Sequence, residues 1–578
     1  MNEAVPRWGS WRGKDNHWHF ALWAPAAGRV ELLLDGQAWP MQACEDGWFR
    51  ASAQADAGAH YRFRIDGTHT IADPASRWQP EGLFGPSALL ADDHPWQHPQ
   101  WRGRPWSASV IYELHVGAAG GSFEAVRAQL PQLAALGINM VELMPVATFP
   151  GNRNWGYDGV LHYAPAAAYG TPGELKALVD SAHGLGISVL LDVVYNHFGP
   201  DGNMLPSIAP AFFRSGVATP WGDAVDFRRH EVQRYFIDNA LMWLREYRFD
   251  GLRLDAVHAI EPRGFLDMLR EEIVAALPGR QVHLVLENED NQASLLARGF
   301  TAQWDDDFHN ALHVLLTGEQ EGYYQDYAAD PTGQLRRVLS EGFAWQGETT
   351  RAGHARGEPS ADVPPERFVI FAQNHDQVGN RAHGERLIQL VGPRRASLAM
   401  ALTALTPMIP MFFLGEPWGA STPFLYFTDH RPPLDEAVRE GRRAEFAQFS
   451  GYHSADARRA IPDPNDPATA MMSRCDWPAD DDQDAAVWLT WFGHLLSVRV
   501  QHLGSVHSVR PLGAQVLAPG AVRAGWQVDD RQWWLAFNIG GQPVRAGLPE
   551  GEEVFRIGAP DVDGALGADS LVAVVVPA

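Results

Sequence analysis

Hydrophobic and polar residues alternate in several short segments of the first 92 residues. In one segment Tyr61, Phe63 and Ile65 alternate with Arg62 and Arg64, which predicts a strand with one buried and one exposed face. Asp-Gly pairs, which are common hairpin turns, separate these segments. The pattern predicts a small β-sandwich over residues 1–92. Its tryptophan-rich surface is compatible with carbohydrate binding, but a packing role is the simpler interpretation.

Residues 93–504 follow a different pattern, in which apolar strands alternate with helical runs. Such alternation indicates βαβ units around a parallel sheet. Eight strand candidates favour a closed (β/α)8 TIM barrel over an open doubly wound sheet, and no Gly-rich phosphate-binding motif follows any of them. The predicted strands are residues 110–116, 139–146, 188–195, 249–257, 282–286, 301–304, 368–373 and 408–414.

Two connections are longer than a barrel requires, namely residues 198–226 after the third strand and 305–367 after the sixth. Both leave from the carboxyl ends of strands, where barrel enzymes place their active sites. After a last helix near residues 485–502, the segment 505–578 contains further strand-like stretches. The chain is therefore predicted to consist of a barrel flanked by an N-terminal and a C-terminal β-sandwich.

The fourth predicted strand carries charge at its end. Leu252 and Leu254 should face the covering helices, so Arg253 and Asp255 should face the other way. Burying an arginine and a carboxylate is costly unless they serve a purpose. Taken alone, the pair is most simply interpreted as a structural ion pair at a sheet edge, and only the other strand ends change that interpretation.

Other predicted strands also end in polar residues. Acidic and imidazole groups that converge on one barrel rim perturb each other's pKa, which is typical of active sites. The sequence has no nucleophilic Ser or Cys motif and no metal-ligand spacing, so three carboxylates favour glycosidic bond cleavage by a proton donor and a facing carboxylate. Spacing does not assign the roles. The strand-end residues are Asp192, Asn196, His197, Arg253, Asp255, Glu287, Asn374, His375 and Asp376.

Composition narrows the possible partners. The net charge of −24 argues against nucleic acid or an anionic membrane as a partner, since both would repel this chain. No apolar run is long enough to span a bilayer, and the N-terminus lacks a signal pattern. The two cysteines, Cys44 and Cys475, form neither a disulfide framework nor a zinc pattern. We therefore expect a cytoplasmic protein without a metal or other cofactor.

Four blocks of sequence, taken in order, resemble the α-amylase clan of retaining glycoside hydrolases. They are residues 192–197, 251–255, 287 and 374–376. The resemblance implies that Asp255 is the nucleophile, that Glu287 is the general acid/base, and that Asp376 grips ring hydroxyls and stabilises the transition state. It further implies that Arg253 holds Asp255, that His197 and His375 hydrogen-bond the sugar, and that Tyr157 stacks on it.

Within that clan, nearly the whole chain resembles the maltooligosyltrehalose trehalohydrolases. Stretches 150–159, 219–222, 303–309 and 373–380 carry this likeness. It implies hydrolysis of the α-1,4 bond next to the terminal trehalose of maltooligosyltrehalose, with trehalose and a maltooligosaccharide as products and a maltooligosyltrehalose synthase as functional partner. Trp221, His258 and Tyr323 are predicted to line the site of the leaving trehalose.

Two details depart from the family pattern, and two alternative functions stay open. Pro417 follows Glu416 where a second acid is expected, and Leu286 precedes Glu287 where alanine is more usual. An α-1,4-glucan branching enzyme would share the barrel and the three carboxylates but would transfer the glycosyl group to a sugar. A non-catalytic glycan-binding protein on the same barrel would usually have lost one of the carboxylates.

Overall fold

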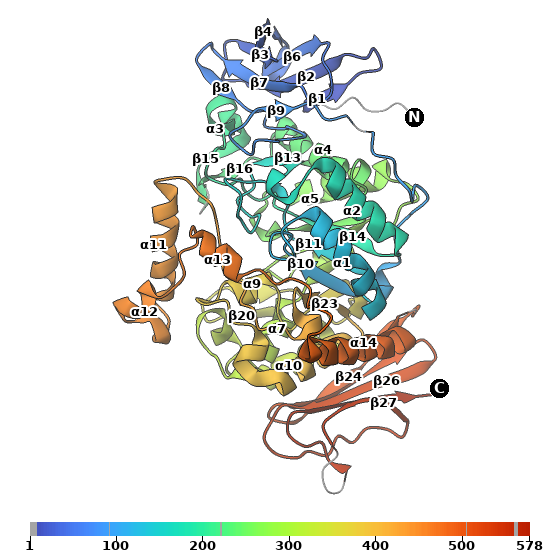
Figure 1. Cartoon of the computed structure of the whole chain (residues 1–578). Helices are drawn as coiled ribbons and strands as arrows, with labels where there is room; N and C mark the ends of the chain where they lie inside the picture. The colour runs from blue at the N-terminus through green and yellow to red at the C-terminus, as the bar shows by residue number, and fades with distance from the viewer. Residues whose placement is uncertain (1–7, 92, 220–221, 505, 560–563, 578) are drawn as a thin grey trace.

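The central domain is a closed barrel of parallel strands, as predicted (Figure 1). The computed structural model describes residues 8–91, 93–219, 222–504, 506–559 and 564–577. The first strand pairs with the last, so the barrel has no free edge. In order around the barrel the strands are β10 (Ile111–Leu114), β11 (Met140–Leu143), β14 (Ser188–Val193), β17 (Gly251–Leu254), β18 (His283–Leu286), β19 (Ala302–Trp304), β22 (Phe368–Ile370) and β23 (Ile409–Phe413).

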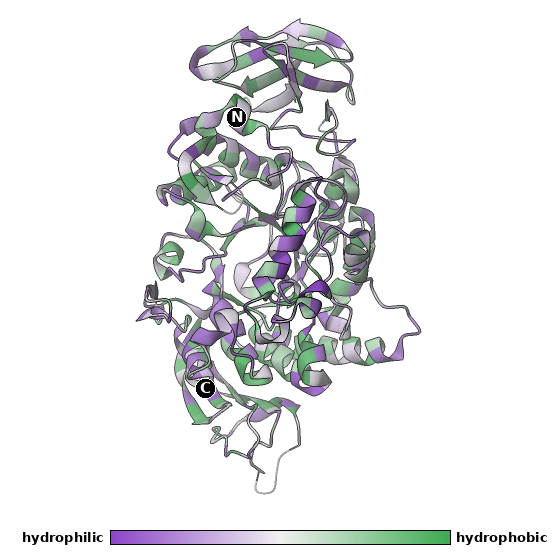
Figure 2. Cartoon of the chain, turned by 90° about the vertical axis from the view of Figure 1, so that its left-hand side faces the viewer, coloured by the Kyte–Doolittle hydropathy of each residue, from purple (hydrophilic) through white to green (hydrophobic). Residues whose placement is uncertain are grey.

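Helices cover the outside of the barrel, and local capping signals determine where several of them begin. The side chain of Ser122 accepts the N–H of Ala125, and Thr171 forms a capping box with Glu174. Figure 2, coloured by hydropathy, shows both hydrophobic and hydrophilic residues on the helices of the molecule, as expected where one side of a helix packs on a core. The main helices are α1 (Phe123–Leu136), α2 (Pro172–Gly184), α4 (His230–Arg245), α5 (Gly264–Ala276), α7 (Asp306–Thr317), α8 (Pro331–Glu341), α10 (Leu387–Leu405) and α14 (Gln483–Leu503).

Strand β17 divides its side chains as its alternation predicts. Leu252 and Leu254 are buried in the large core outside the barrel, whereas Arg253 points inward, with its guanidinium carbon 4.1 Å from the centre of the Trp304 ring. A Cβ at Gly251 would lie 2.2 Å from the carbonyl oxygen of His283 on the neighbouring strand. The glycine therefore permits close approach of β17 and β18, which brings their carboxyl ends together.

The N-terminal module consists of two antiparallel sheets at one end of the molecule, at the top of Figure 1. Their facing sides bury Phe20, Leu22, Leu32 and Phe63, which completes the predicted sandwich. The strands are β1 (Gly9–Arg12), β2 (Trp18–Trp23), β6 (Trp48–Ala53) and β5 (Gln42–Ala43) in one sheet, and β4 (Gln37–Pro40), β3 (Val30–Leu34), β7 (His60–Ile65), β8 (His69–Ile71) and β9 (Ser87–Ala88) in the other.

The C-terminal region forms one antiparallel sheet among its described residues, where a sandwich of two sheets was predicted. Helices α8, α10 and α14 of the barrel cover one face of this sheet. Val544 and Leu566 pack with Val572 and Val574 on the other. A second sheet is unnecessary because these helices already bury the apolar face. The strand order is β24 (Val509–Ala518), β25 (Ala521–Val528), β26 (Arg531–Asn538), β28 (Ser570–Val576) and β27 (Glu552–Ile557).

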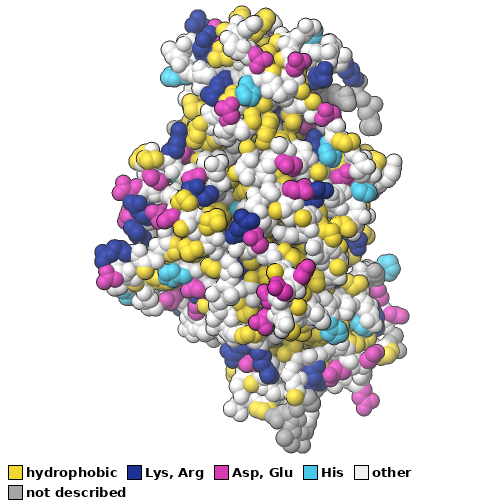
Figure 3. Space-filling view, viewed as in Figure 1, with side chains coloured by type: hydrophobic (Ala, Val, Ile, Leu, Met, Phe, Trp, Pro, Cys, Tyr) yellow, Lys and Arg dark blue, Asp and Glu magenta, His cyan; other side chains and the backbone are white. Residues whose placement is uncertain are grey.

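The predicted domain boundaries stay predictions, because residues 92 and 505 lie outside the described residues. The 198–226 connection contains a hairpin of β15 (Phe213–Thr219) and β16 (Gly222–Val225), and the 305–367 connection contains α7, α8 and a second small hairpin. Within the described part of the chain, no helix combines the length and apolar character needed to cross a membrane. Acidic and basic side chains are interspersed over the visible face (Figure 3).

Trp533 provides a test of the contact between the C-terminal sheet and the barrel. Its ring is buried, and its indole N–H donates to the carbonyl of Leu405 at 2.8 Å. We expect Trp533→Ala to remove roughly 3–5 kcal/mol of packing free energy and to lower the calorimetric unfolding midpoint. Trp39→Ala, at a side chain 46% exposed, should leave the midpoint nearly unchanged. Equal midpoints for the two variants would contradict the proposed importance of this contact.

Candidate active site

Asp255 comes directly after β17 and is held by Arg253 of the same strand and by Asn196, which follows the neighbouring strand β14. Arg253 donates from Nη1 to Oδ1 of Asp255 at 2.7 Å, and Asn196 donates from Nδ2 to Oδ2 at 2.7 Å. The Asp255 side chain is 14% exposed. Both carboxylate oxygens are therefore oriented by charge-assisted or amide hydrogen bonds while one side of the group stays open.

Arg253 does not belong to an isolated edge ion pair. Its Nη1 also donates to both oxygens of Asp192, at 2.9 and 2.8 Å, and its Nη2 lies 3.8 Å from Oε2 of Glu287. Burial raises the pKa of Asp192 to about 6, with Arg253 opposing the shift and Asp255 adding to it. One buried cation thus serves three strand-end carboxyl groups.

Glu287 follows β18 and approaches Asp255 through the backbone. Its Oε2 accepts the N–H of Ala256 at 2.5 Å. Ala256 adopts a left-handed conformation with φ of 41°, an uncommon conformation for an alanine. This turn directs the backbone N–H that follows Asp255 toward the carboxyl group on the next strand, and so fixes the relative positions of the two acids.

The environment of Glu287 suits a proton donor. Burial raises the pKa of the Glu287 carboxyl to about 8, although the charge of Arg253 opposes the shift. The neighbouring carboxylates of Asp255, Asp306 and Asp376 act in the same direction as burial. A carboxyl group with this pKa keeps its proton at neutral pH and can donate it to a leaving group.

Asp376 is the second residue of the short helix α9 (His375–Gly379). The side chain of Asn374 caps this helix and accepts the backbone N–H of Asp376 at 2.9 Å. The Asp376 side chain is 44% exposed, more than that of Asp255 or Glu287. It therefore lies at the open side of the rim, where it is available to ligand hydroxyl groups.

His375 is clamped by an acid from the first barrel strand. Glu113 accepts from Nδ1 of His375 at 2.5 Å and from its backbone N–H at 3.1 Å. Nε2 of His375 lies 2.8 Å from the hydroxyl of Tyr157, which donates to Asp192 at 2.7 Å. Burial lowers the pKa of His375, but Asp376 and Glu113 outweigh it and raise the value to about 9.

Two other predicted contact residues, Tyr157 and His197, contact residues of this centre. Tyr157 stacks on His375 with ring centres 5.2 Å apart. His197 has Nδ1 2.5 Å from Oδ1 of Asn196 and Nε2 2.8 Å from the carbonyl of Tyr157, so both ring nitrogens already have protein partners. Its contact with a sugar therefore stays a prediction.

The residues predicted to recognise trehalose lie on the surrounding loops. His258 is in the turn after Ala256, with Nδ1 accepting the N–H of Glu289 at 3.4 Å. Tyr323 lies in a 3-10 turn and is 52% exposed. Trp221 lies outside the described residues.

Two acids of the site, Glu113 and Asp306, were not predicted from the sequence. Glu113 is buried on β10, two residues after the inward-facing Ile111, and this inward position in an apolar strand is a signal that was overlooked. Asp306 begins α7, and burial together with the charge of Asp376 raises its pKa to about 6. Its position after a barrel strand was a weaker signal, since such acids also cap helices.

Glu416 has a structural function despite the unusual Pro417 beside it. Its Oε2 accepts the N–H of Phe413 at 2.6 Å, and burial raises its pKa to about 7.

Among the described residues, no group of three or more His, Cys, Asp or Glu side chains is arranged to hold a metal ion.

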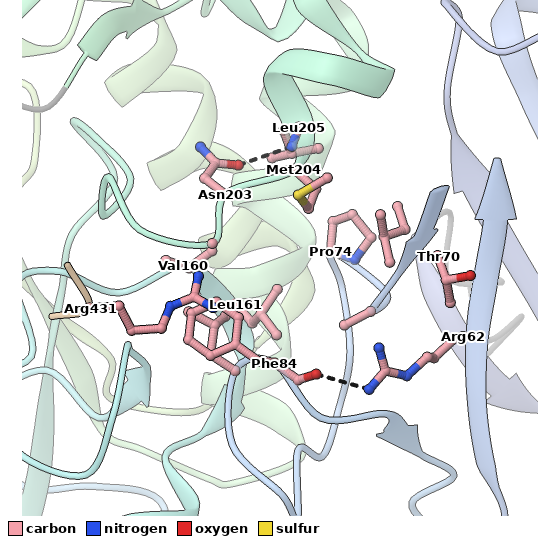
Figure 4. A pocket seen from close by; sticks show the side chains of 14 residues that line it. Arg62, Thr70, Pro74, Phe84, Val160, Leu161, Asn203, Met204, Leu205 and Arg431 are labelled. Atoms are coloured by element: carbon pink, nitrogen blue, oxygen red, sulfur yellow. Dashed lines mark hydrogen bonds between the residues drawn. The ribbon is translucent and has the colours of Figure 1, made fainter. Parts of the chain in front are cut away.

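A cavity of about 170 Å³ lies between the N-terminal module and the barrel loops (Figure 4). The guanidinium of Arg431 covers the face of Phe84 at 3.3 Å, and Arg62 donates to the Phe84 carbonyl at 2.9 Å. No Asp or Glu is among its described lining residues. This cavity therefore lacks the carboxyl groups that cleavage of a glycosidic bond needs. It lies at the interface between the N-terminal module and the barrel.

Comparison with known proteins agrees with this architecture. The family model for the alpha amylase catalytic domain matches residues 79–206, and that for carbohydrate-binding module 48 (isoamylase N-terminal domain) matches residues 8–88. A malto-oligosyltrehalose trehalohydrolase from Rhizobium sp. (strain M-11) is 39% identical over 554 residues, covering 91% of this chain and 90% of that protein. The chain belongs to the malto-oligosyltrehalose trehalohydrolase family.

Other relatives support this placement. A crystal structure of a putative alpha amylase from Salmonella typhimurium superposes with a TM-score of 0.94 at 41% identity, covering 99% of this chain and 100% of that chain. A 1,4-alpha-glucan branching enzyme from Corynebacterium jeikeium (strain K411) matches at 35% identity over 44% of this chain and 39% of that protein. The likeness to the Rhizobium trehalohydrolase covers most of both chains, whereas that to the branching enzyme covers less than half of either.

The pKa of Glu287 provides a test of its role in this trehalohydrolase family member. If protonated Glu287 is required, kcat/KM should fall as pH rises through about 8. Asp306→Asn removes one of the charges that raise this pKa, so the alkaline limb should move to lower pH by roughly 0.5 unit. Asp480→Asn, which removes an exposed acid before α14, should leave the limb in place. Identical profiles for both variants would contradict the assignment.

Proposed function

We propose that this chain hydrolyses the α-1,4-glucosidic bond next to the terminal trehalose of maltooligosyltrehalose, with retention of configuration. The observation that carries this proposal is the arrangement of two carboxyl groups around one arginine. Glu287 is kept protonated by its surroundings, while Asp255 is held by Arg253 and Asn196. Membership of the trehalohydrolase family supports trehalose as the leaving group.

The reaction divides between the acids in two steps. Glu287 gives its proton to the glycosidic oxygen while Asp255 attacks the anomeric carbon, which releases trehalose and leaves a glycosyl-enzyme. Glu287, now ionised, takes a proton from water, and the water attacks the same carbon and frees Asp255. Asp376, with its exposed carboxylate, is placed to accept hydrogen bonds from the ring hydroxyls and to stabilise the positive charge of the transition state.

The proposed substrate has to be made by another enzyme. A maltooligosaccharide with trehalose at its end requires an enzyme that forms the α,α-1,1 linkage at the reducing end, so a maltooligosyltrehalose synthase is the functional partner we propose. Cys44 and Cys475 are both free. Free thiols are typical of proteins in a reducing compartment, so we propose that the protein is located in the cytoplasm.

Product analysis tests the proposed reaction. The purified protein incubated with maltotriosyltrehalose should release trehalose and maltotriose, and proton NMR should show the α-anomer of maltotriose as the first product. Asp255→Asn should reduce kcat by roughly 10³-fold or more while leaving the circular dichroism spectrum unchanged. Asp480→Asn should retain full activity.

Three results would each contradict the proposal. Conversion of linear amylose into branched glucan, with no trehalose from the capped substrate, would identify a branching enzyme. Binding of maltooligosaccharides without turnover would identify a glycan-binding protein. A β-anomer as first product would refute the nucleophilic role of Asp255.

A further inference from the structure

A cavity of about 460 Å³ opens beside the catalytic rim, and no step of the mechanism uses it. Three segments form its walls: the turn Gly322–Asp326, the loop after α9, and the region from the end of α11 (Leu434–Phe446) to the turn Ser450–Tyr452. In Figure 1, α11 and α12 (Ala455–Arg459) form a projection beside the barrel. We call this cavity the Tyr452 pocket. Its lining includes Tyr323, Asn380, Arg381, Glu385, Phe449 and Tyr452.

The Tyr452 pocket is connected to Asp376 through Asn380. Asn380, which lines the pocket, donates from Nδ2 to Oδ1 of Asp376 at 3.3 Å and from its backbone N–H to the Asp376 carbonyl at 2.8 Å. Although about half of the Tyr323 side chain is exposed, desolvation of its hydroxyl raises the pKa of Tyr323, on another wall, to about 12, and the charge of Asp376 adds to the shift. A sugar chain that occupies the catalytic centre therefore has this pocket within reach.

Every charged side chain that lines the pocket has a partner within the protein, and these pairs are Arg381 with Glu319 and Glu385, Glu321 with Ser450, and Glu445 with Arg442. Arg381 binds Glu319 through two hydrogen bonds of 2.8 Å, and its Nε lies 3.4 Å from Glu385. Glu319 also accepts from His313 at 2.8 Å. Arg381 is the only Lys or Arg among the described lining residues, so the pocket has no spare positive charge for a phosphate or carboxylate. A neutral polyol, which hydrogen-bonds to the edges of such ion pairs, fits this chemistry.

Aromatic rings supply the flat surfaces that a pyranose needs. Phe449 and Tyr452 pack against Phe446 with ring centres 5.5 and 5.2 Å apart, and the half-exposed Tyr323 belongs to another wall. Ring faces of this kind contact the apolar C–H groups of sugars, and the polar rim satisfies the hydroxyls.

Direct contacts between protein groups join the walls of the Tyr452 pocket. Glu321 accepts the N–H of Ser450 at 3.1 Å and its hydroxyl at 3.1 Å, which ties the Tyr452 side to the Tyr323 side. At Gly322, which has φ of 61°, a Cβ would lie 3.2 Å from the ring of Phe449. The pocket is therefore pre-formed, which lowers the entropic cost of binding.

We propose that the Tyr452 pocket is an accessory subsite that binds an α-linked glucosyl residue of the substrate away from the cleaved bond. This inference rests on the proposed function and deepens it. The residue belongs either to the trehalose that leaves or to the glucan chain that remains. Both present the same pyranose faces and hydroxyls, so the experiment must distinguish them.

The test compares Tyr452→Ala and Phe449→Ala with wild type on capped substrates that carry one to five glucosyl units before the trehalose. We expect about a tenfold loss of kcat/KM on substrates that reach the pocket, which is the size of one lost aromatic contact. Tyr452→Phe should restore most of the loss because it keeps the ring. α-Glucosyl fluoride, which fills only the cleaved position, should be hydrolysed at the wild-type rate by all three variants.

Two further measurements, the dependence on chain length and the inhibition by trehalose, identify which part of the substrate binds in the pocket. If the pocket holds glucan, the loss grows with chain length and inhibition by free trehalose is unchanged. If it holds trehalose, the loss is the same at every length and inhibition by trehalose weakens. Phe84→Ala, at an exposed ring in the other cavity, is the matched control and should change neither quantity.

The inference is overturned if both alanine variants stay within twofold of wild type on every capped substrate, or if they lose α-glucosyl fluoride hydrolysis equally. If Tyr452→Ala does not fold, Phe449→Ala by itself tests the pocket by the same criteria. Failure of the proposed function itself looks different, because wild type would then release no trehalose from any substrate.

Discussion

The buried guanidinium of Arg253 is the interaction on which the site depends. Three carboxyl groups from neighbouring strands, those of Asp192, Asp255 and Glu287, lie within 4 Å of it. Without the cation, burial of these acids in one place would be strongly unfavourable, and with it the strand ends are held in register. The pairing of Asp192 with Arg253 across β14 and β17 places the cation beside the acid of the adjacent strand. Trp304 beneath the guanidinium excludes water from its lower side.

Around this cation, the two acids that we propose for catalysis have different surroundings. Asp255 receives hydrogen bonds on both oxygens, whereas Glu287 receives one from a backbone N–H and lies near other carboxylates. The left-handed turn at Ala256 makes the second arrangement possible. A chain of contacts then continues from Asp192 through Tyr157 and His375 to Glu113, so the first strand of the barrel helps to position the seventh.

The flanking modules bury apolar surface against the barrel and leave its active rim free. The C-terminal sheet packs on barrel helices through residues such as Trp533, and the N-terminal module meets the barrel at Phe84 and Arg431. The rim is extended instead by insertions within the barrel sequence, which supply Tyr323 and Tyr452. The residues that we propose for specificity therefore lie on loops, while those that we propose for the chemistry lie at strand ends.

The sequence by itself determined the strand order of the barrel and the carboxylates at its rim. Periodicity shows which face of a strand is buried, and parallel strands bring their carboxyl ends to one side, so Asp255, Glu287 and Asp376 were identifiable from local pattern and family resemblance together. Only the tertiary structure decided the contact between His375 and Glu113, which are 262 residues apart. It also decided that helices of the barrel, and not a second sheet, cover the C-terminal sheet. It also decided the raised pKa of Glu287. These features arise from distant groups that meet only after folding, and no local pattern encodes burial or the charges that surround a side chain.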